Sequence, residues 1–386
     1  MIYIFLRTLD SSDKRLKPVM RGRSSMRSKL TFFMGSDVPA STETLFTNLN
    51  NLISDTFDIE FVGFYGEKRF QEDVSEVIYD FPSKEGVSRL YHSIKALKKY
   101  DKEHETDLII LPHKQSVYCI PFLLSVDLNN TVVRLNGDTF NLYKDRYYES
   151  SLNRAKVFII THVFSRLLLK KSLGVIVQTE YMKDECSKRN IDPKKISVLP
   201  LPIDTTRFKK VSEEKRAELR KELDLDQQDS VGLIIGTQSR KKRRHVLDRL
   251  LRRSKDLDDI KFVVIGDSPI GEKLSKKYSN VRYEGFVKNE RLPRYYQAAD
   301  FLLHFSINEG LPTTFQEATA CGLPVIARKA NYNRDLNICK FKDVEELEDI
   351  LAKEVWKDSD SYVTPGLQKK RYVEFFQRMI ENKGKK

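Results

Sequence analysis

The strongest constraint on the fold is an alternation of short apolar runs with longer amphipathic segments. The apolar runs have strand length and little polar alternation, as is typical of strands buried on both faces of a sheet. The segments between them, such as residues 42–53 and 87–99, carry apolar residues at helical spacing. The pattern predicts a parallel sheet with helices on both faces. In the first half, the strand-like runs lie at residues 2–6, 59–65, 107–111, 131–135, 157–160 and 174–178.

A second series of runs begins after a stiff linker. Residues 196–204 predict a strand that leads into a segment containing Pro200 and Pro202. Strand-like runs return at residues 231–235, 261–265, 300–305 and 324–327. We therefore expect an α/β protein with two Rossmann-like parallel-sheet domains facing a cleft, at residues 1–203 and 204–361. Residues 362–386 predict an amphipathic helix with an apolar face of Tyr372, Phe375, Phe376 and Met379.

The composition is that of a globular protein in a reducing compartment. Hydrophobic residues make up 40% and charged residues 32% of the 386-residue chain. The four cysteines are scattered and form no C-x-x-C pair, which argues against a zinc site or a disulfide framework. We see no secretory signal and no run of the ~18 apolar residues that a spanning helix needs. We expect a cytoplasmic protein, with peripheral attachment to a membrane as an alternative.

The net charge of +13 predicts anionic partners, such as nucleotide phosphates, an anionic lipid surface or nucleic acid. Residues 10–29 hold seven cations, among them Arg21 and Arg23, against two acids. Because this segment follows the predicted strand at residues 2–6, we expect a basic loop at the carboxyl edge of the sheet, where open parallel sheets bind their ligands. Such a loop favours an anionic ligand, such as an anionic substrate, or an anionic membrane surface. A disordered solubilising loop is the alternative.

The most informative stretch is residues 308–327, which predict a loop, a helix, a glycine stop and a strand. Gly310 permits a backbone shape that a side chain would hinder. Thr313 and Thr314 lie where the helix begins, and either is a candidate cap. Free N–H groups at that helix start form an anion site. Gly322 suits the end of the helix.

Two carboxylates, Glu309 and Glu317, flank this anion site. Their eight-residue separation spans the loop and one to two helical turns, so both side chains are able to face one bound ligand. An ordinary strand–turn–helix unit with solvated glutamates is the alternative interpretation of this pair alone.

The stretch resembles the family-four glycosyltransferases of the two-domain GT-B fold, whose signature is E-x7-E followed by an A-x-G-x-P-V-I-A-like ending. Glu309, Glu317 and residues 320–327 match it. By this resemblance, Glu309 contacts the donor sugar near the reacting carbon, Glu317 binds the ribose diol, and the backbone from Leu311 to Thr314 holds the diphosphate. The resemblance also implies that the C-terminal helix packs back on the N-terminal domain.

A second match lies at residues 233–244, where a strand and a small-residue loop precede a basic run. The family has G-R-x-x-x-x-K-G here, and its arginine and lysine bind the diphosphate. Gly236 and Lys242 fall on matching positions, whereas Thr237 replaces the arginine. Arg240 is a candidate for the missing charge. A solvated helix face is the alternative interpretation of the basic run.

Further matches extend from about residue 174 to residue 327, among them a segment that resembles the family's Y-x-x-A-D and ends at Asp300. The segments ending at Asp267 and Val287 resemble family segments that close the donor site and approach the nucleobase. The first half matches poorly. There, Asp138 is a candidate to polarise the acceptor or the donor sugar, with Arg134 to orient it and His113 as a weaker candidate; Asp138 as a turn-capping residue is the alternative.

Together these motifs predict a glycosyltransferase that moves a hexosyl group from a UDP- or GDP-linked donor to an unidentified hydroxyl acceptor. The nucleotide sugar is a substrate, and we expect no cofactor. The Asp-x-Asp triplets at residues 224–226 and 358–360 look like polar loops or helix ends, so we expect no metal. Retention of anomeric configuration is implied by the resemblance alone.

Two alternatives to this function stay open. One is another reaction on the same fold, such as nucleotide-sugar epimerisation or glycosyl phosphorolysis. The other is a non-catalytic module that binds nucleic acid or other anions on a decayed transferase scaffold. The charge of +13 and the replacement of the family's arginine by Thr237 favour this alternative. The presence of both Glu309 and Glu317 argues against decay, so nucleic acid is the less favoured partner.

Overall fold

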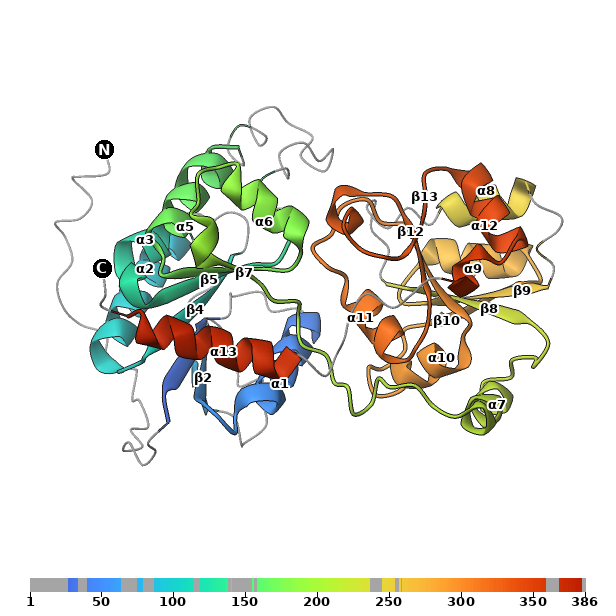
Figure 1. Cartoon of the computed structure of the whole chain (residues 1–386), viewed down its shortest axis with the longest axis horizontal. Coiled ribbons are helices and arrows are strands. Elements are labelled where there is room, and N and C mark those ends of the chain that lie inside the picture. Colours follow the sequence, from blue (N-terminus) through green and yellow to red (C-terminus); the bar gives the residue numbers. More distant parts are fainter. Residues whose placement is uncertain are drawn as a thin grey trace.

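The chain forms two all-parallel α/β units that lie next to each other (Figure 1). The computed structural model describes residues 27–33, 40–63, 75–78, 87–113, 119–137, 140, 155, 158–236, 245–253, 257, 259–358 and 368–383. The first unit is built on a seven-stranded sheet and the second on a six-stranded sheet. The predicted α/β class with two Rossmann-like domains is therefore confirmed.

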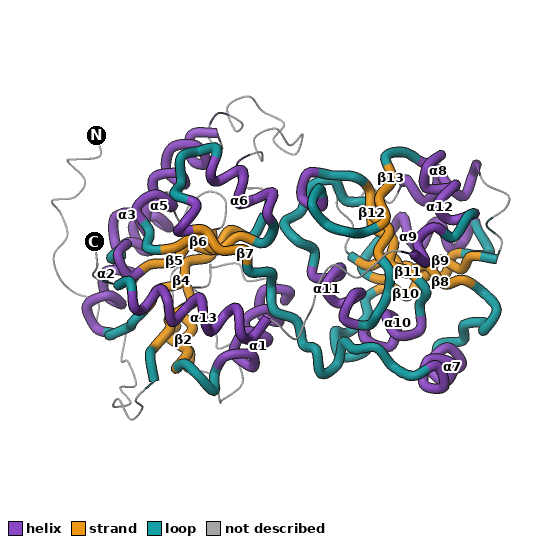
Figure 2. Tube along the Cα trace, in the orientation of Figure 1, coloured by secondary structure: helices purple, strands orange, loops and turns teal. Residues whose placement is uncertain are grey.

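The N-terminal sheet has the strand order β3-β2-β1-β4-β5-β6-β7. Its strands are β1 (Lys29–Phe33), β2 (Asp58–Gly63), β3 (Ser75–Ile78), β4 (Leu108–His113), β5 (Thr131–Leu135), β6 (Gly174–Val177) and β7 (Ile196–Val198). The helical elements are α1 (Ala40–Ile53), α2 (Val87–Glu103), α3 (Cys119–Ser125), η2 (Leu128–Asn130), the π-helical η4 (Ile160–Ser165), α5 (Arg166–Lys171), α6 (Glu180–Ser187) and η5 (Pro193–Lys195). Figure 2 shows α2, α3, α5 and α6 on one face of the sheet and α1 on the other. Separate apolar clusters fill the two faces.

The central strand β1 was not predicted from the sequence, because two of its five residues are polar. The Lys29 ammonium pairs with the Glu60 carboxylate across 2.8 Å. The Thr31 hydroxyl, fully buried, shares a hydrogen bond of 2.7 Å with the Tyr100 hydroxyl. Each polar group is thus satisfied by a residue far along the chain, which local periodicity does not reveal.

The position of β1 also corrects the expected position of the basic segment. Residues 2–6 and most of residues 10–29 lie outside the described part of the chain. The described end, Arg27 to Lys29, leads into the amino end of β1, and Arg27 donates a hydrogen bond to the Ser54 carbonyl. This end of the segment therefore lies at the edge of the sheet opposite the carboxyl edge where we expected the loop.

The described part of the run at residues 157–160, which is residues 158–160, does not form a strand. Residues 158–171 form one helix that includes η4 and α5. The neighbours of β5 in the sheet are β4 and β6, so no position is left for another strand beside it. Phe158 and Ile159 are 44% and 50% exposed, and the run is therefore apolar without being part of the core.

The C-terminal sheet has the order β10-β9-β8-β11-β12-β13. Its strands are β8 (Ser230–Ile235), β9 (Ile260–Ile265), β10 (Val281–Gly285), β11 (Phe301–His304), β12 (Val325–Arg328) and β13 (Cys339–Phe341). Its helical elements are α7 (Glu213–Glu222), α8 (His245–Arg253), α9 (Pro269–Lys277), α10 (Leu292–Ala298), α11 (Thr313–Ala320), η7 (Asn331–Asn333), α12 (Val344–Ala352) and η8 (Val355–Asp358). The chain passes between the sheets after β7, and we keep residues 203/204 as the proposed domain boundary.

The C-terminal helix α13 (Gln368–Glu381) returns to the N-terminal domain, as expected. Its buried residues share an apolar cluster with β1, β2 and α1. The predicted apolar face is correct, and these buried residues are Tyr372, Phe375, Phe376 and Met379. Together with α1, this helix covers the lower face of the sheet in Figure 1.

Candidate functional site

Polar groups gather where the carboxyl ends of the C-terminal strands meet the N-terminal domain. This edge is where open parallel sheets bind ligands. Glu309 follows β11, and its carboxylate accepts a hydrogen bond of 2.9 Å from the Ser306 hydroxyl. The Tyr332 hydroxyl donates to the Ser306 carbonyl at 3.2 Å. Burial, followed by the charge of Glu309, raises the pKa of Tyr332, so this phenol keeps its proton.

The start of α11 has no side-chain cap. Pro312 occupies the N-cap position and has no side-chain group that accepts a hydrogen bond, so neither Thr313 nor Thr314 caps the helix as expected. Thr314 instead lies inside the first turn with a buried hydroxyl that has no hydrogen-bond partner. An uncapped helix start beside an unsatisfied hydroxyl offers donors to an anion. Gly322 ends the helix region at φ 74°, as predicted.

The loop between Glu309 and α11 is in contact with the N-terminal domain. The Gln178 side-chain oxygen accepts a hydrogen bond from the Leu311 N–H at 2.5 Å. A Cβ atom on Gly310 would lie 2.2 Å from that same oxygen and 3.0 Å from the Asn136 carbonyl. Gly310 is therefore required by the close approach of two domains, and its φ is not in the left-handed region. Gln178 was not predicted as a site residue.

Glu317 lies inside α11 and points to α10. Its carboxylate accepts a hydrogen bond of 2.6 Å from the Tyr296 hydroxyl. Burial raises the pKa of Glu317 to about 7, although the Tyr296 hydrogen bond and the charge of Arg207 act in the opposite direction. Tyr296 is 1% exposed, and it too was absent from the predicted site. A signal was present, because Tyr296 begins the Y-x-x-A-D segment noted in the sequence.

The other predicted donor-side residues that the structure describes follow neighbouring strands. Gly236 follows β8, and its N–H donates to the Ile265 carbonyl at the end of β9. Asp267 follows β9 and is exposed, and Val287 follows β10 and is half-buried. Phe286, beside Val287, is 80% exposed. Parallel strands place all of these at one edge, as the site requires.

Several predicted residues lie outside the described part of the chain. These are Lys242, Arg240, Asp138, Arg21 and Arg23. The neighbour of Asp138 is described, however. A Cβ atom on Gly137 would lie 3.9 Å from the Gly310 nitrogen, so the end of β5 reaches the E-x7-E loop. His113 is the last residue of β4, and its backbone therefore lies at the same carboxyl edge.

The structure corrects the expected role of Arg134. Its side chain is buried, at 6% exposure, and donates to the Tyr372 hydroxyl at 2.8 Å and to the Leu199 carbonyl at 3.4 Å. The guanidinium thus joins α13 and the linker to the sheet. A side chain held in this way does not orient an acceptor in the cleft.

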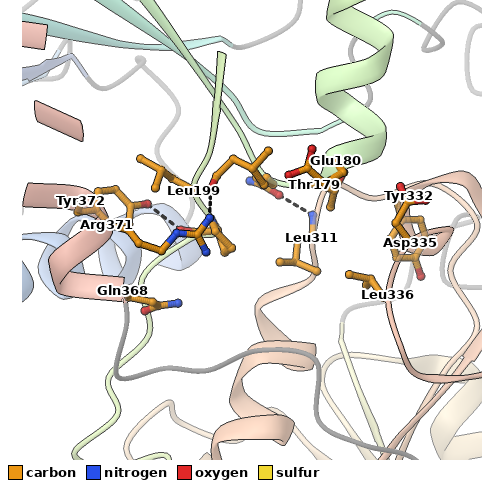
Figure 3. A pocket seen from close by; sticks show the side chains of 13 residues that line it. Thr179, Glu180, Leu199, Leu311, Tyr332, Asp335, Leu336, Gln368, Arg371 and Tyr372 are labelled. Atoms are coloured by element: carbon orange, nitrogen blue, oxygen red, sulfur yellow. Dashed lines mark hydrogen bonds between the residues drawn. The ribbon is translucent and has the colours of Figure 1, made fainter. Parts of the chain in front are cut away.

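A cavity of about 230 Å³ lies between the domains (Figure 3). Gln178 and Glu180 line it from the N-terminal domain, Leu311 and Tyr332 from the C-terminal domain, and Arg371 from α13. Neither Glu309 nor Glu317 lines it.

The described residues contain no group of three or more His, Cys, Asp or Glu side chains that is arranged to hold a metal ion. No described helix has the length and apolar character to cross a membrane.

Comparisons with known proteins agree with the observed fold. Residues 215–350 match the family described as glycosyl transferases group 1. The chain is 25% identical over 259 residues to an alpha-monoglucosyldiacylglycerol synthase of Streptococcus pneumoniae, covering 64% of this chain and 57% of the relative. It is 30% identical over 195 residues to the putative teichuronic acid biosynthesis glycosyltransferase TuaC of Bacillus subtilis, covering 50% and 46%.

The chain spans about half the length of these curated relatives. In overall structure it is similar to Anabaena Alr3699/HepE in complex with UDP and glucose, with a TM-score of 0.64, 17% identity, and coverage of 92% of this chain and 99% of the other. The chain therefore has the two-domain GT-B fold of glycosyltransferases, and its residues 215–350 are similar to the glycosyl transferases of group 1.

Proposed function

We propose that the chain transfers a hexosyl group from a UDP- or GDP-linked sugar to a hydroxyl acceptor. The observation that carries the proposal is the segment after β11, in which Glu309, Glu317 and the uncapped start of α11 flank a loop that contacts Gln178 of the N-terminal domain. Similarity of residues 215–350 to group 1 glycosyltransferases supports it.

In this proposal the two glutamates act on opposite ends of the donor. Glu317 accepts hydrogen bonds from the ribose diol, in competition with the Tyr296 hydroxyl that it now binds. Glu309, oriented by Ser306, contacts the sugar near the reacting carbon. The N–H groups at the start of α11, the Thr314 hydroxyl and Lys242 stabilise the negative charge that develops on the departing diphosphate. The reaction retains anomeric configuration and needs no metal ion.

We further propose a lipid acceptor. A relative named alpha-monoglucosyldiacylglycerol synthase matches 64% of this chain, and its name states a glucosylated diacylglycerol as the product. The net charge of +13 suits an acceptor that lies in an anionic membrane. The N-terminal domain would then receive the acceptor, and the C-terminal domain the nucleotide sugar.

The test is release of nucleotide from UDP- and GDP-sugars, with and without diacylglycerol in mixed micelles. We expect release from one donor, faster with the lipid, and unchanged by EDTA. Absence of release from every donor would refute the transferase proposal. Loss of activity in EDTA that manganese or magnesium restores would refute the metal-free mechanism. A sugar nucleotide that is isomerised without transfer would identify an epimerase.

A further inference from the structure

The helix at residues 158–171 leaves part of its apolar surface exposed, although Leu168 and Leu169 are buried in the core. A surface helix turns its polar side chains to water and its apolar side chains to the core. Here Thr161 and Ser165 are fully buried, whereas Val163 and Leu167 are 54% and 41% exposed. The Ser165 hydroxyl is satisfied by the Ile160 carbonyl, at 3.0 Å.

The exposed apolar side chains form one face, which we call the outer apolar face. The π-helical turn η4 brings residues four and five positions apart to the same side of the helix. Leu124, which is 59% exposed, adds to it from α3, and α3 contacts both η4 and α5. The outer apolar face thus consists of Leu124, Phe158, Ile159, Val163 and Leu167. Contiguous exposed side chains of this kind mark an interaction surface.

Cations lie at the C-terminal end of the same helix. Lys170 and Lys171 are both exposed. Lys195 of η5 joins them, because its ammonium donates to the carbonyls of Lys170 and Ser172, each at 3.0 Å. The exposed Asp192, at the N-cap of η5, is an acid on the adjoining element. An apolar face next to exposed cations is the pattern of a surface that enters an anionic bilayer interface.

The outer apolar face also points in the right direction for a membrane-borne acceptor. The helix ends just before β6, at the amino edge of the sheet, and it must run antiparallel to the parallel strands β5 and β6. Its 14 residues span roughly 20 Å, so Phe158 lies toward the carboxyl edge, on the side of the cleft. A bilayer on this face would hold its lipid headgroups close to the acceptor side of the site.

We propose that the outer apolar face and the cations at residues 170 and 171 dock the N-terminal domain on an anionic lipid bilayer. The apolar side chains insert at the level of the headgroups, and the lysines pair with anionic lipids. The inference rests on the proposed function only in that it gives the lipid acceptor a route to the cleft.

The experiment is flotation of the full chain with phosphatidylcholine vesicles that contain increasing phosphatidylglycerol, at several salt concentrations. We expect binding that rises with phosphatidylglycerol and falls with salt. The triple variant Ile159→Ser, Val163→Ser, Leu167→Ser should bind about tenfold less or weaker still, because it loses most of the inserted apolar area. Val355→Ser, which changes an exposed apolar residue of the C-terminal domain, is the matched control and should bind normally.

The charge contribution is tested in the same assay. Lys170→Gln with Lys171→Gln should weaken the dependence on phosphatidylglycerol, whereas Lys353→Gln with Lys370→Gln, at lysines 69% and 73% exposed elsewhere, should change it less. Donor hydrolysis in the absence of lipid should be the same in all variants, which shows that they are folded.

Normal vesicle binding by the triple variant would overturn the docking proposal. A wild-type dimer in sedimentation that the triple variant converts to a monomer, with vesicle binding unchanged, would assign the face to a second copy and also overturn it. Vesicle binding that depends on the outer apolar face, without turnover of any nucleotide sugar, would leave docking standing and refute the transferase proposal.

Discussion

The side-chain oxygen of Gln178, at the end of β6, accepts a hydrogen bond of 2.5 Å from the backbone N–H of Leu311 in the loop before α11. One residue of the N-terminal domain thereby holds the loop that we propose binds the donor diphosphate. Gln178 is 2% exposed, so the contact is inside the interface. The donor loop is therefore shaped by both domains together.

We predict that Gly310→Ala destabilises the protein by forcing this contact apart. The added Cβ would meet the Gln178 oxygen at 2.2 Å and the Asn136 carbonyl at 3.0 Å. Overpacking of this kind costs about 1–3 kcal/mol. Adding Gln178→Ala should recover part of the loss, since only the first clash is removed, and urea unfolding of the four proteins measures the coupling. Equal effects of Gly310→Ala with and without Gln178 would contradict the prediction.

The two glutamates should separate binding from turnover. Glu317→Ala should weaken UDP-sugar binding by about 1–3 kcal/mol, because the ribose hydroxyls lose their acceptor. Glu309→Gln should leave binding nearly unchanged and slow the release of nucleotide, because its contact is made near the reacting carbon. Calorimetry and single-turnover kinetics distinguish the two effects. If both variants bind and turn over normally, the E-x7-E assignment is wrong.

The raised pKa of Glu317 predicts that donor binding depends on pH. In the free protein this pKa is about 7, so the carboxyl group is largely protonated at pH 6 and ionised at pH 8. UDP-glucose has no group of its own that titrates between these values, and its affinity should rise by roughly tenfold from pH 6 to pH 8. Glu317→Gln should remove the dependence. Tyr296→Phe removes the hydrogen bond that lowers the pKa and should move the midpoint upward.

Ionisation of Glu317, which should favour donor binding, should lower the stability of the folded protein. A carboxyl group whose pKa is raised by folding destabilises the folded state as it ionises, so the penalty grows from about pH 4.5 to pH 7 and is constant above. Glu317→Gln should therefore be more stable than the wild type at pH 8 and similar at pH 4.5. Urea unfolding at the two pH values measures the difference, and a gain that is the same at both would contradict the assigned pKa.

Tyr372→Phe should weaken the attachment of α13. The Tyr372 hydroxyl donates to the Pro200 carbonyl at 2.7 Å and accepts from Arg134 at 2.8 Å. Its loss leaves a buried guanidinium group with one partner fewer, which costs about 1–3 kcal/mol. Tyr278→Phe, which removes a single hydrogen bond to Asp248, is the control. Equal losses in urea unfolding would show that the Arg134 contact adds nothing.

The bounds of the predicted strands were more exact in the C-terminal domain, although β10 and β13 were not predicted there. Strands β8, β9, β11 and β12 are apolar runs that periodicity detects, and the predicted bounds agree to within one residue. β1 was missed because Lys29 and Thr31 interrupt the apolar pattern, and their partners Glu60 and Tyr100 become neighbours only after folding. The strand predicted at residues 157–160 was wrong for the opposite reason. An apolar run at the protein surface has the same sequence pattern as a buried strand, and residues 158–160 are helical.

The sequence predicted the part of the candidate site that lies in one continuous segment. It did not predict the part that the other domain contributes. Glu309, Glu317, Gly310 and the start of α11 belong to one continuous segment, so spacing alone indicated their proximity. Gln178 reaches that segment from 133 positions away along the chain, and only the packing of the two sheets brings it there. Arg134 was assigned to the cleft because it lies near the carboxyl end of a middle strand, whereas its side chain is long enough to reach the linker and α13.

The return of α13 has a mechanical consequence. Trp356 of η8 is buried in the C-terminal core, whereas α13 packs on the N-terminal domain. At the start of α13, the Gln368 amide donates to the Gln316 side chain of α11 at 3.0 Å and to the Leu201 carbonyl at 3.4 Å. The polypeptide thus crosses between the domains twice, once after β7 and again before α13. A body tethered at one point is free to turn about any axis, whereas a body tethered at two points swings about the line that joins them. Opening and closing of the two domains should then be a rotation about one axis. The domains would return to the same relative position in every cycle.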